Sequence, residues 1–256
     1  MITKKLRTMI LRVLGSSSSG NGYLLRSERT GEVLILEAGI RFDKVKQALG
    51  FDLSHVVGCL VTHEHGDHAK YAADFAKAYI PLFTSPGTIE AAHLQNMPTV
   101  HPVASMKAFN IGEFEILPFP VQHDALQPYG YLIRHPECGT VLFATDTYYL
   151  RYRFPGLNNI LIECNYDQKI LSHNVEVGRI DHKRYERTVK SHMSFNTCRE
   201  TLMANDLSKV NNIILVHLSA DNSNAAEFIS GIREATGKTV LAAAAGMEMS
   251  FNKTPY

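Results

Sequence analysis

Four side chains that can bind a metal ion lie within six residues, in the order His-x-His-x-Asp-His: His63, His65, Asp67 and His68. They directly follow an apolar run over residues 56–61, whose length and composition are typical of a buried strand. We therefore expect the four side chains on the loop at the end of that strand. Imidazole and carboxylate groups together suit zinc, iron, manganese or nickel. Because packing alone rarely requires such a pattern, it predicts a metal site.

Three further candidate ligands each follow an apolar, strand-like segment. His123 comes after residues 114–119, Asp146 after residues 141–144, and His217 after residues 213–216. A single histidine after a strand is usually a satisfied surface or core residue. The shared setting of all three is the stronger signal, because the ends of several strands can meet at one edge of a sheet.

The motif and the order of the later residues resemble the metallo-β-lactamase fold family. The opening over residues 14–39, with the loop of Ser16, Ser17, Ser18 and Ser19, resembles the YycJ/WalJ-like nuclease branch of that family. The resemblance implies an α/β fold, a four-layer α-β-β-α sandwich. It also implies a single metallo-β-lactamase-like domain over residues 1–256. A role beside the metals for Ser17, Ser18 or Asn21 and a plain turn between strands both remain open.

Carried over residue by residue, the resemblance implies a centre with two divalent metal ions. The first ion would be held by His63, His65 and His123, and the second by Asp67, His68 and His217, with Asp146 bridging the two. Zinc is the default ion for a histidine-rich site, and manganese or iron would also suit these ligands. Such a pair of ions activates a bridging hydroxide, which Asp67 would orient, and stabilises the attacking and leaving oxygens of a displacement.

Two more polar residues resemble catalytic residues of tRNA 3′-processing nucleases and YycJ-like nucleases. Glu163 ends a strand-like run, and His192 precedes a segment with Ser194 as a fitting helix N-cap. If Glu163 orients His192, the imidazole can donate a proton to the departing alkoxide. The backbone N–H groups of residues 194–196 would then offer a seat for a phosphate oxygen. The alternative is that His192 caps a loop and Glu163 is a solvated strand end.

The chain is nearly neutral, with a formal net charge of +1, but residues 179–190 are locally basic. Arg184, Arg187 and Lys190 can share one helical face there. Such a face is usually only solvated. Beside a phosphate-cleaving centre it would instead track a nucleic-acid backbone.

These features favour a metal-dependent hydrolase that cleaves phosphodiester bonds, with DNA or RNA as the expected substrate. A small-molecule (cyclic) phosphodiesterase is the nearest alternative. Within the family that the chain resembles, glyoxalase-II-like thioester hydrolases add a helical region after the last histidine, for which the 39 residues after His217 leave little room. A non-hydrolytic redox module with two metal ions is a further alternative. The pattern does not indicate an oligomeric state.

Four cysteines lie far apart in the sequence, and Cys59 and Cys164 fall in or beside apolar runs. Buried free thiols are therefore expected, which favours a reducing, cytoplasmic setting. No apolar segment approaches the roughly 18 residues of a membrane span, so no membrane contact is expected.

Local patterns predict several other elements. Residues 69, 72, 73, 76 and 79 repeat at helical spacing and predict one helix from Asp67 onward with these side chains in the core. Residues 106–109 predict a strand. Asn222 or Ser223 is expected to cap a helix over residues 225–235, which Gly237 would end.

Overall fold

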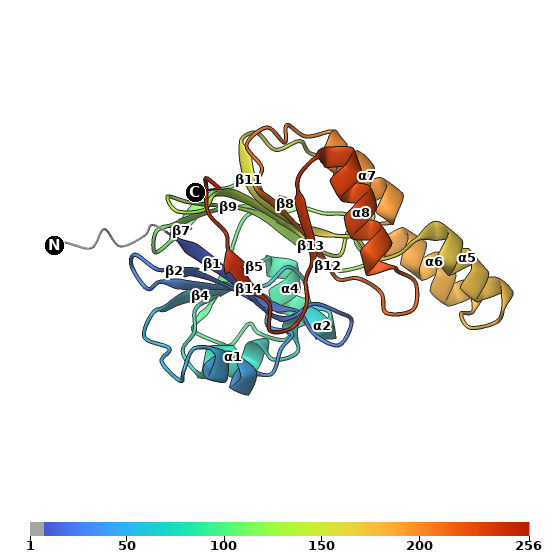
Figure 1. Ribbon diagram of the computed structural model, residues 1–256. Coiled ribbons are helices and arrows are strands. Elements are labelled where there is room, and N and C mark those ends of the chain that lie inside the picture. Colours follow the sequence, from blue (N-terminus) through green and yellow to red (C-terminus); the bar gives the residue numbers. More distant parts are fainter. Residues whose placement is uncertain (1–7, 256) are drawn as a thin grey trace.

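Two seven-stranded mixed sheets pack face to face in the computed structural model, which describes residues 8–255 (Figure 1). The first sheet has the spatial order β14 (Glu248–Ser250), β1 (Met9–Gly15), β2 (Gly22–Ser27), β3 (Val33–Leu36), β4 (Val56–Leu60), β5 (Leu82–Thr84) and β6 (Val100–Pro102). The second has the order β13 (Thr239–Ala242), β12 (Asn212–Val216), β11 (Leu157–Glu163), β10 (Gly139–Ala144), β9 (Tyr129–His135), β8 (Phe114–Pro120) and β7 (Phe109–Ile111).

Helices cover the outer face of each sheet. The short α2 (Gly66–Ala69) lies near α1 (Phe42–Ala48), α3 (Ala72–Lys77) and α4 (Pro86–Ala91) on the side of the first sheet, and α7 (Phe195–Met203) and α8 (Ala225–Thr236) cover the second (Figure 1). One apolar cluster fills the space between the sheets, and two others join each sheet to its helices. The predicted four-layer sandwich is confirmed.

Burial along the strands follows their place in these layers. β1 alternates between buried and half-buried residues, as expected for a strand near the edge of a sheet. All seven residues of β11 are buried, because this strand is parallel to both β10 and β12 and the sheet is covered on both faces. In the second sheet β8, β10 and β12 run in the same direction, so their carboxyl ends, which precede three of the candidate ligands, lie at one side of that sheet.

One helical hairpin projects beyond the sandwich. α5 (Gln168–Glu176) and α6 (His182–Ser191) extend from the rest of the chain as an arm (Figure 1). The arm has its own small apolar cluster, built around Tyr166, Leu171 and Ile180. Asp167 and Asp181 cap the two helices by accepting backbone N–H groups of the first turn.

Three local predictions were wrong. The helix expected from Asp67 is split into α2 and α3, because the Tyr71 N–H donates to the Ala38 carbonyl across the fold. Tyr79 lies beyond the end of α3 with a φ of 61° and is 79% exposed, so it is not a core residue. The strand expected over residues 106–109 begins only at Phe109, and the N-cap of α8 is Asn224, neither Asn222 nor Ser223.

The predicted burial of the cysteines is confirmed, since all four are buried free thiols. Within residues 8–255, no helix is both long and apolar enough to cross a membrane. The single-domain boundary and the cytoplasmic setting stay predictions, and residues 1–7 and 256 of the predicted domain lie outside the described residues.

Gly39 allows a close approach between the end of β3 and the metal-binding motif. A Cβ atom at this position would lie 1.7 Å from the Asp67 carbonyl oxygen. We therefore expect Gly39→Ala to lower the free energy of unfolding by about 1–3 kcal/mol in urea denaturation, because the backbone must shift. Gly66→Ala is the matched control, since its Cβ would meet no atom within 4 Å, and it should change stability by less than about 1 kcal/mol. Equal stabilities of the two variants would contradict this explanation.

Candidate metal centre

The structure brings all seven predicted metal ligands together at one edge between the two sheets. The His-x-His-x-Asp-His motif occupies the loop after β4 and the short α2 that follows it. His123 follows β8, Asp146 follows β10, and His217 follows β12. The side chains form two groups whose potential ligand atoms lie within 4.8 Å of one another: His63, His65 and His123 in the first, and Asp67, His68, Asp146 and His217 in the second.

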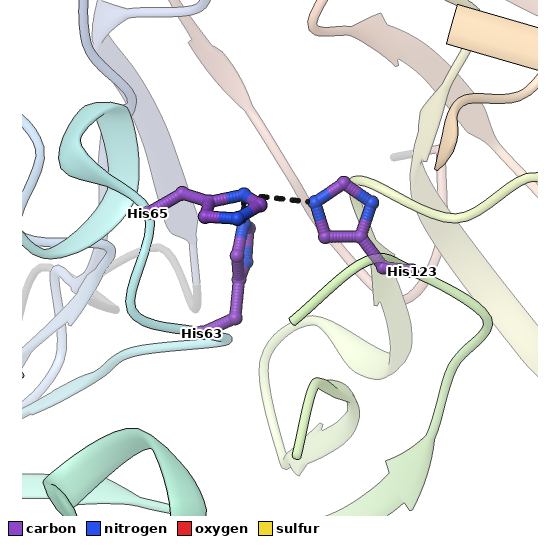
Figure 2. Close-up of side chains that lie close together, drawn as sticks. All are labelled: His63, His65 and His123. Atoms are coloured by element: carbon purple, nitrogen blue, oxygen red, sulfur yellow. Dashed lines mark hydrogen bonds between the residues drawn. The ribbon is translucent and has the colours of Figure 1, made fainter. Parts of the chain in front are cut away.

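Three imidazoles of the first group point their nitrogens at a common centre (Figure 2). His63 Nε2 lies 3.1 Å from His65 Nδ1, and His123 Nε2 lies 3.0 Å from the same atom. An ion bound at roughly 2.0–2.1 Å by imidazole nitrogens would separate neighbouring nitrogens by about 2.9 Å at a 90° angle and about 3.4 Å at the tetrahedral angle. The observed spacing therefore fits a shared metal ion.

The tautomers of these imidazoles also favour a cation. Thr62 Oγ1 donates its proton to Glu37, so His63 Nδ1 must donate to Thr62 Oγ1, at 2.9 Å. His123 Nδ1 donates to the backbone carbonyl of Ser191 at 2.8 Å. Both Nε2 atoms thus present lone pairs to His65 Nδ1, which can supply one proton at most. A metal ion resolves the remaining contact between lone pairs.

Burial keeps two of these rings neutral, which is the form that binds a metal. Desolvation lowers the pKa of His63 well below its ordinary value and also lowers that of His123. The nearby Asp146 carboxylate opposes this shift in both rings without reversing it.

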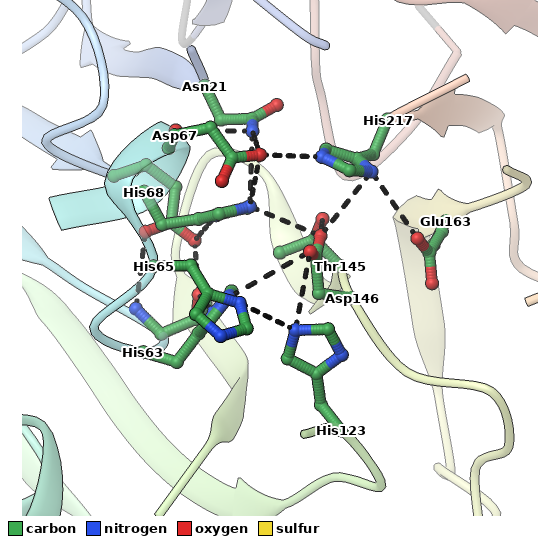
Figure 3. Close-up of polar contacts among 12 residues, drawn as sticks. Asn21, His63, His65, Asp67, His68, His123, Thr145, Asp146, Glu163 and His217 are labelled. Atoms are coloured by element: carbon green, nitrogen blue, oxygen red, sulfur yellow. Dashed lines mark hydrogen bonds and ion pairs between the residues drawn. The ribbon is translucent and has the colours of Figure 1, made fainter. Parts of the chain in front are cut away.

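Carboxylates and imidazoles alternate in the second group (Figure 3). Asp67 Oδ2 lies 2.9 Å from His217 Nε2 and 3.3 Å from His68 Nε2. Asp146 Oδ1 lies 3.2 Å from His68 Nε2. Asp146 Oδ2 faces the first group, 3.8 Å from His63 Nε2 and 3.7 Å from His123 Nε2. This one carboxylate therefore faces both groups, as a bridging ligand would.

The field in the second group is strongly negative. Burial alone would lower the pKa of His68, but the Asp146 and Glu37 carboxylates raise it well above its ordinary value. Burial would also lower the pKa of His217, but Asp146 and, after it, Asp67 outweigh burial and raise this pKa to about 10. Burial would raise the pKa of Asp67, yet its hydrogen bond to His217 lowers it strongly. Such a field attracts cations, whether protons or metal ions.

Polar groups around the ligands fix their orientation, and sequence patterns had not identified most of them. Glu37 is buried, accepts the Thr62 N–H and hydroxyl, and lies 3.3 Å from His68 Nδ1. Asn165 Nδ2 lies 3.2 Å from His217 Nδ1 and donates to the His217 carbonyl. Glu37 and Asn165 each follow an apolar strand, as the ligands do, but that position alone is too common to single them out.

The serine loop lies beside the centre. Ser16 Oγ accepts the His217 backbone N–H at 2.9 Å and the Tyr23 hydroxyl at 2.8 Å. Asn21 is fully buried, and its Nδ2 lies 3.3 Å from Asp67 Oδ2 and 3.1 Å from His68 Nε2. The segment between β1 and β2 is therefore more than a turn, because Ser16 holds the backbone of His217 and Asn21 contacts the side chains of Asp67 and His68.

Glu163 and His192 form the expected pair. His192 Nδ1 lies 2.6 Å from Glu163 Oε1, and the backbone N–H groups of Thr147 and Met193 donate to Glu163 Oε2. Burial would lower the pKa of His192, but the Glu163 carboxylate raises it. Since Glu163 is fully buried, the alternative of a solvated strand end is wrong.

At the phosphate seat predicted at residues 194–196, one of the three backbone N–H groups already has a partner within the chain. The Phe195 N–H donates to the Tyr166 carbonyl at 2.8 Å, and Ser194 Oγ accepts the Thr197 N–H at 3.1 Å. The Phe195 N–H is therefore not available to a phosphate, and for the N–H groups of residues 194 and 196 the seat stays a prediction.

Comparison with known proteins agrees with this geometry. Residues 39–218 match the beta-lactamase superfamily domain, a stretch that contains all seven predicted ligands. The chain is 30% identical over 230 residues to a protein named exodeoxyribonuclease YycJ from Bacillus anthracis, covering 82% of this chain and 83% of the relative. It is 28% identical over 230 residues to one named exodeoxyribonuclease WalJ from Streptococcus pneumoniae serotype 2 (strain D39 / NCTC 7466), covering 82% of each.

A solved structure shares the architecture. The metallo-beta-lactamase fold protein YhfI from Bacillus subtilis superposes with a TM-score of 0.72 at 16% identity, covering 94% of this chain and 99% of that protein. At this identity the likeness bears on the fold alone. The domain match and the sequence similarity to YycJ and WalJ indicate common ancestry. The chain therefore belongs to the beta-lactamase superfamily and has its metallo-β-lactamase fold.

Proposed function

We propose that this metal-dependent hydrolase cleaves phosphodiester bonds in nucleic acid, with two divalent metal ions at its centre. The observation that carries the proposal is the single buried carboxylate of Asp146, which faces a triad of imidazoles on one side and Asp67, His68 and His217 on the other. Two adjacent ions lower the pKa of a shared water and stabilise both oxygens of an in-line displacement at phosphorus.

The protein's own residues would position the reactants. Asp67 is 19% exposed at its side chain, whereas Asp146 and the His68 ring are almost fully buried. Asp67 is therefore the carboxylate with access to the substrate side, where it can orient the attacking water. Zinc is the expected ion because the donor set is rich in histidine, and manganese or iron would also suit it.

His192 would protonate the leaving oxygen. Its Nδ1 is held by Glu163, so Nε2 is the atom that can carry the transferable proton. Glu163 also raises the pKa of His192, which favours the protonated form that a general acid requires. Glu163 is a positioning residue, because it acts through His192.

A nucleic acid is favoured over a small phosphodiester by the relatives named exodeoxyribonucleases, which match over 82% of this chain. Hydrolysis of bis-p-nitrophenyl phosphate, single- and double-stranded DNA, and RNA by metal-analysed protein tests this choice. We expect cleavage of the ester and of at least one polymer, with both activities lost in His65→Ala. Cleavage of the ester with all polymers intact would instead indicate a small-molecule phosphodiesterase. Two bound metal ions without either activity would contradict phosphodiester hydrolysis.

The loss of kcat on removal of the proposed acid should depend on the leaving group of the substrate. We expect His192→Ala to reduce kcat about 10²–10⁴-fold on an oligonucleotide, whose alkoxide needs a proton. On bis-p-nitrophenyl phosphate the loss should stay below about tenfold, because p-nitrophenolate leaves without protonation. Glu163→Gln, which keeps a hydrogen-bond acceptor, should show an intermediate loss with the same substrate dependence. Equal losses on both substrates would rule out His192 as the acid.

The two metal sites should be separable by mutation. We expect His123→Ala to lose the first ion and His217→Ala the second, each reducing metal content from two ions to about one per chain, because each removes one of few protein ligands. Metal content after dialysis, measured by elemental analysis, gives the result. His173→Ala is the matched control, since His173 is an exposed residue of α5 outside both groups. Unchanged metal content in both ligand variants would contradict the assignment.

A further inference from the structure

The arm formed by α5 and α6 is attached to the metal centre at the end of α6. Ser191, the last residue of α6, accepts the hydrogen bond from His123 Nδ1, and His192 follows it directly. Arg187 and Arg184 lie four and seven residues before Ser191, so they share one helical face with it. Because α6 is attached to the centre at Ser191, the guanidinium groups of Arg184 and Arg187 are held on the side of α6 that faces the centre.

Both arginines line a cavity of about 210 Å³ that reaches the centre itself. Its other walls include His192 and His217, together with polar side chains such as Ser18 and Thr188. Among the described residues that line it, none carries a carboxylate. The cavity is therefore cationic and polar, in contrast to the carboxylate-rich second group of ligands next to it.

The two guanidinium groups have only weak partners in the protein. Arg187 Nε lies 3.8 Å from Asp124 Oδ2, and Arg184 Nη2 lies 3.8 Å from Asp221 Oδ2. All four side chains are substantially exposed, and ion pairs of this length and exposure contribute little. Most guanidinium N–H donors thus remain available to an anionic ligand. Asp124 Oδ1 also lies 3.3 Å from His123 Nε2, so Asp124 lies between Arg187 and the first group of ligands.

We infer that this cavity binds a non-scissile phosphate of the nucleic-acid strand, the one next to the scissile bond on the leaving-group side. The inference rests on the proposed function. His192, the proposed acid, lines the cavity, so the part of the strand whose oxygen His192 protonates would extend into the cavity. Guanidinium groups bind phosphate oxygens in bidentate geometry. The cavity is smaller than the roughly 300–1,000 Å³ of pockets that enclose drug-sized ligands, so the bases would stay outside it.

Paired charge-removal variants test the cavity. We expect Arg184→Ala/Arg187→Ala to reduce kcat/KM on an oligonucleotide about 10–100-fold, while hydrolysis of bis-p-nitrophenyl phosphate stays within threefold. Lys169→Ala/Arg199→Ala is the matched control: it removes two exposed charges from α5 and α7, the helices that flank α6 in the sequence, and neither residue lines the cavity. Its oligonucleotide activity should fall less than threefold at the same ionic strength.

A chemical change in the substrate identifies the phosphate. A single neutral methylphosphonate next to the scissile bond on the leaving-group side should slow the wild-type protein but leave the double arginine variant unaffected, because both changes remove the same contact. The same replacement on the other side of the scissile bond should slow both proteins equally.

Three results would overturn the inference. The first is an equal loss of kcat/KM on the oligonucleotide in the arginine variant and in the control variant. The second is that the effects of the methylphosphonate and of the arginine substitutions add. The third is that the arginine variant loses as much activity on bis-p-nitrophenyl phosphate as on the oligonucleotide. Each of these requires an active wild-type protein. Inactivity of the wild type on both the ester and the polymers would instead count against the proposed function itself.

Discussion

The arrangement of the centre depends on the buried carboxylate of Asp146. Its oxygens lie within 4 Å of five imidazoles, those of His68, His217, His123, His63 and His192. An isolated carboxylate is costly to bury, and its pKa would rise. Here the surrounding histidines, His217 first, outweigh burial and hold the pKa of Asp146 well below its ordinary value. The loops that carry these histidines therefore converge on one charge.

Backbone conformation directs several of these side chains inward. Glu37, Asp146 and His217 each lie within two residues of the end of a strand and have φ values of 70°, 37° and 55°. Residues other than glycine rarely adopt this region, at a cost of about 1–3 kcal/mol each. The neighbouring hydrogen bonds hold them there, such as the one from the His217 N–H to Ser16. Strands in two sheets thus support a strained edge, where the candidate metal centre lies.

The motif, the family resemblance and the position after apolar strands together predicted the seven residues that the structure brings together, and strand ends are local features of a sequence. These patterns could not reveal Glu37, whose role depends on the contact with Thr62 across parallel strands. The split between α2 and α3 was equally hidden, since it arises from a hydrogen bond between Tyr71 and Ala38. The basic run on α6 was visible, but which of its side chains face the centre depends on where the arm attaches, a tertiary feature.

Each group of ligands combines residues from both sheets. His63 and His65 extend from the first sheet and His123 from the second, and the second group is divided in the same way between His68 and His217. The space between the sheets behind this edge is filled by an apolar cluster. An ion bound at either group would link the two sheets at their polar edge. Binding of such an ion would therefore stabilise this edge, since a ligand that binds only the folded form stabilises it.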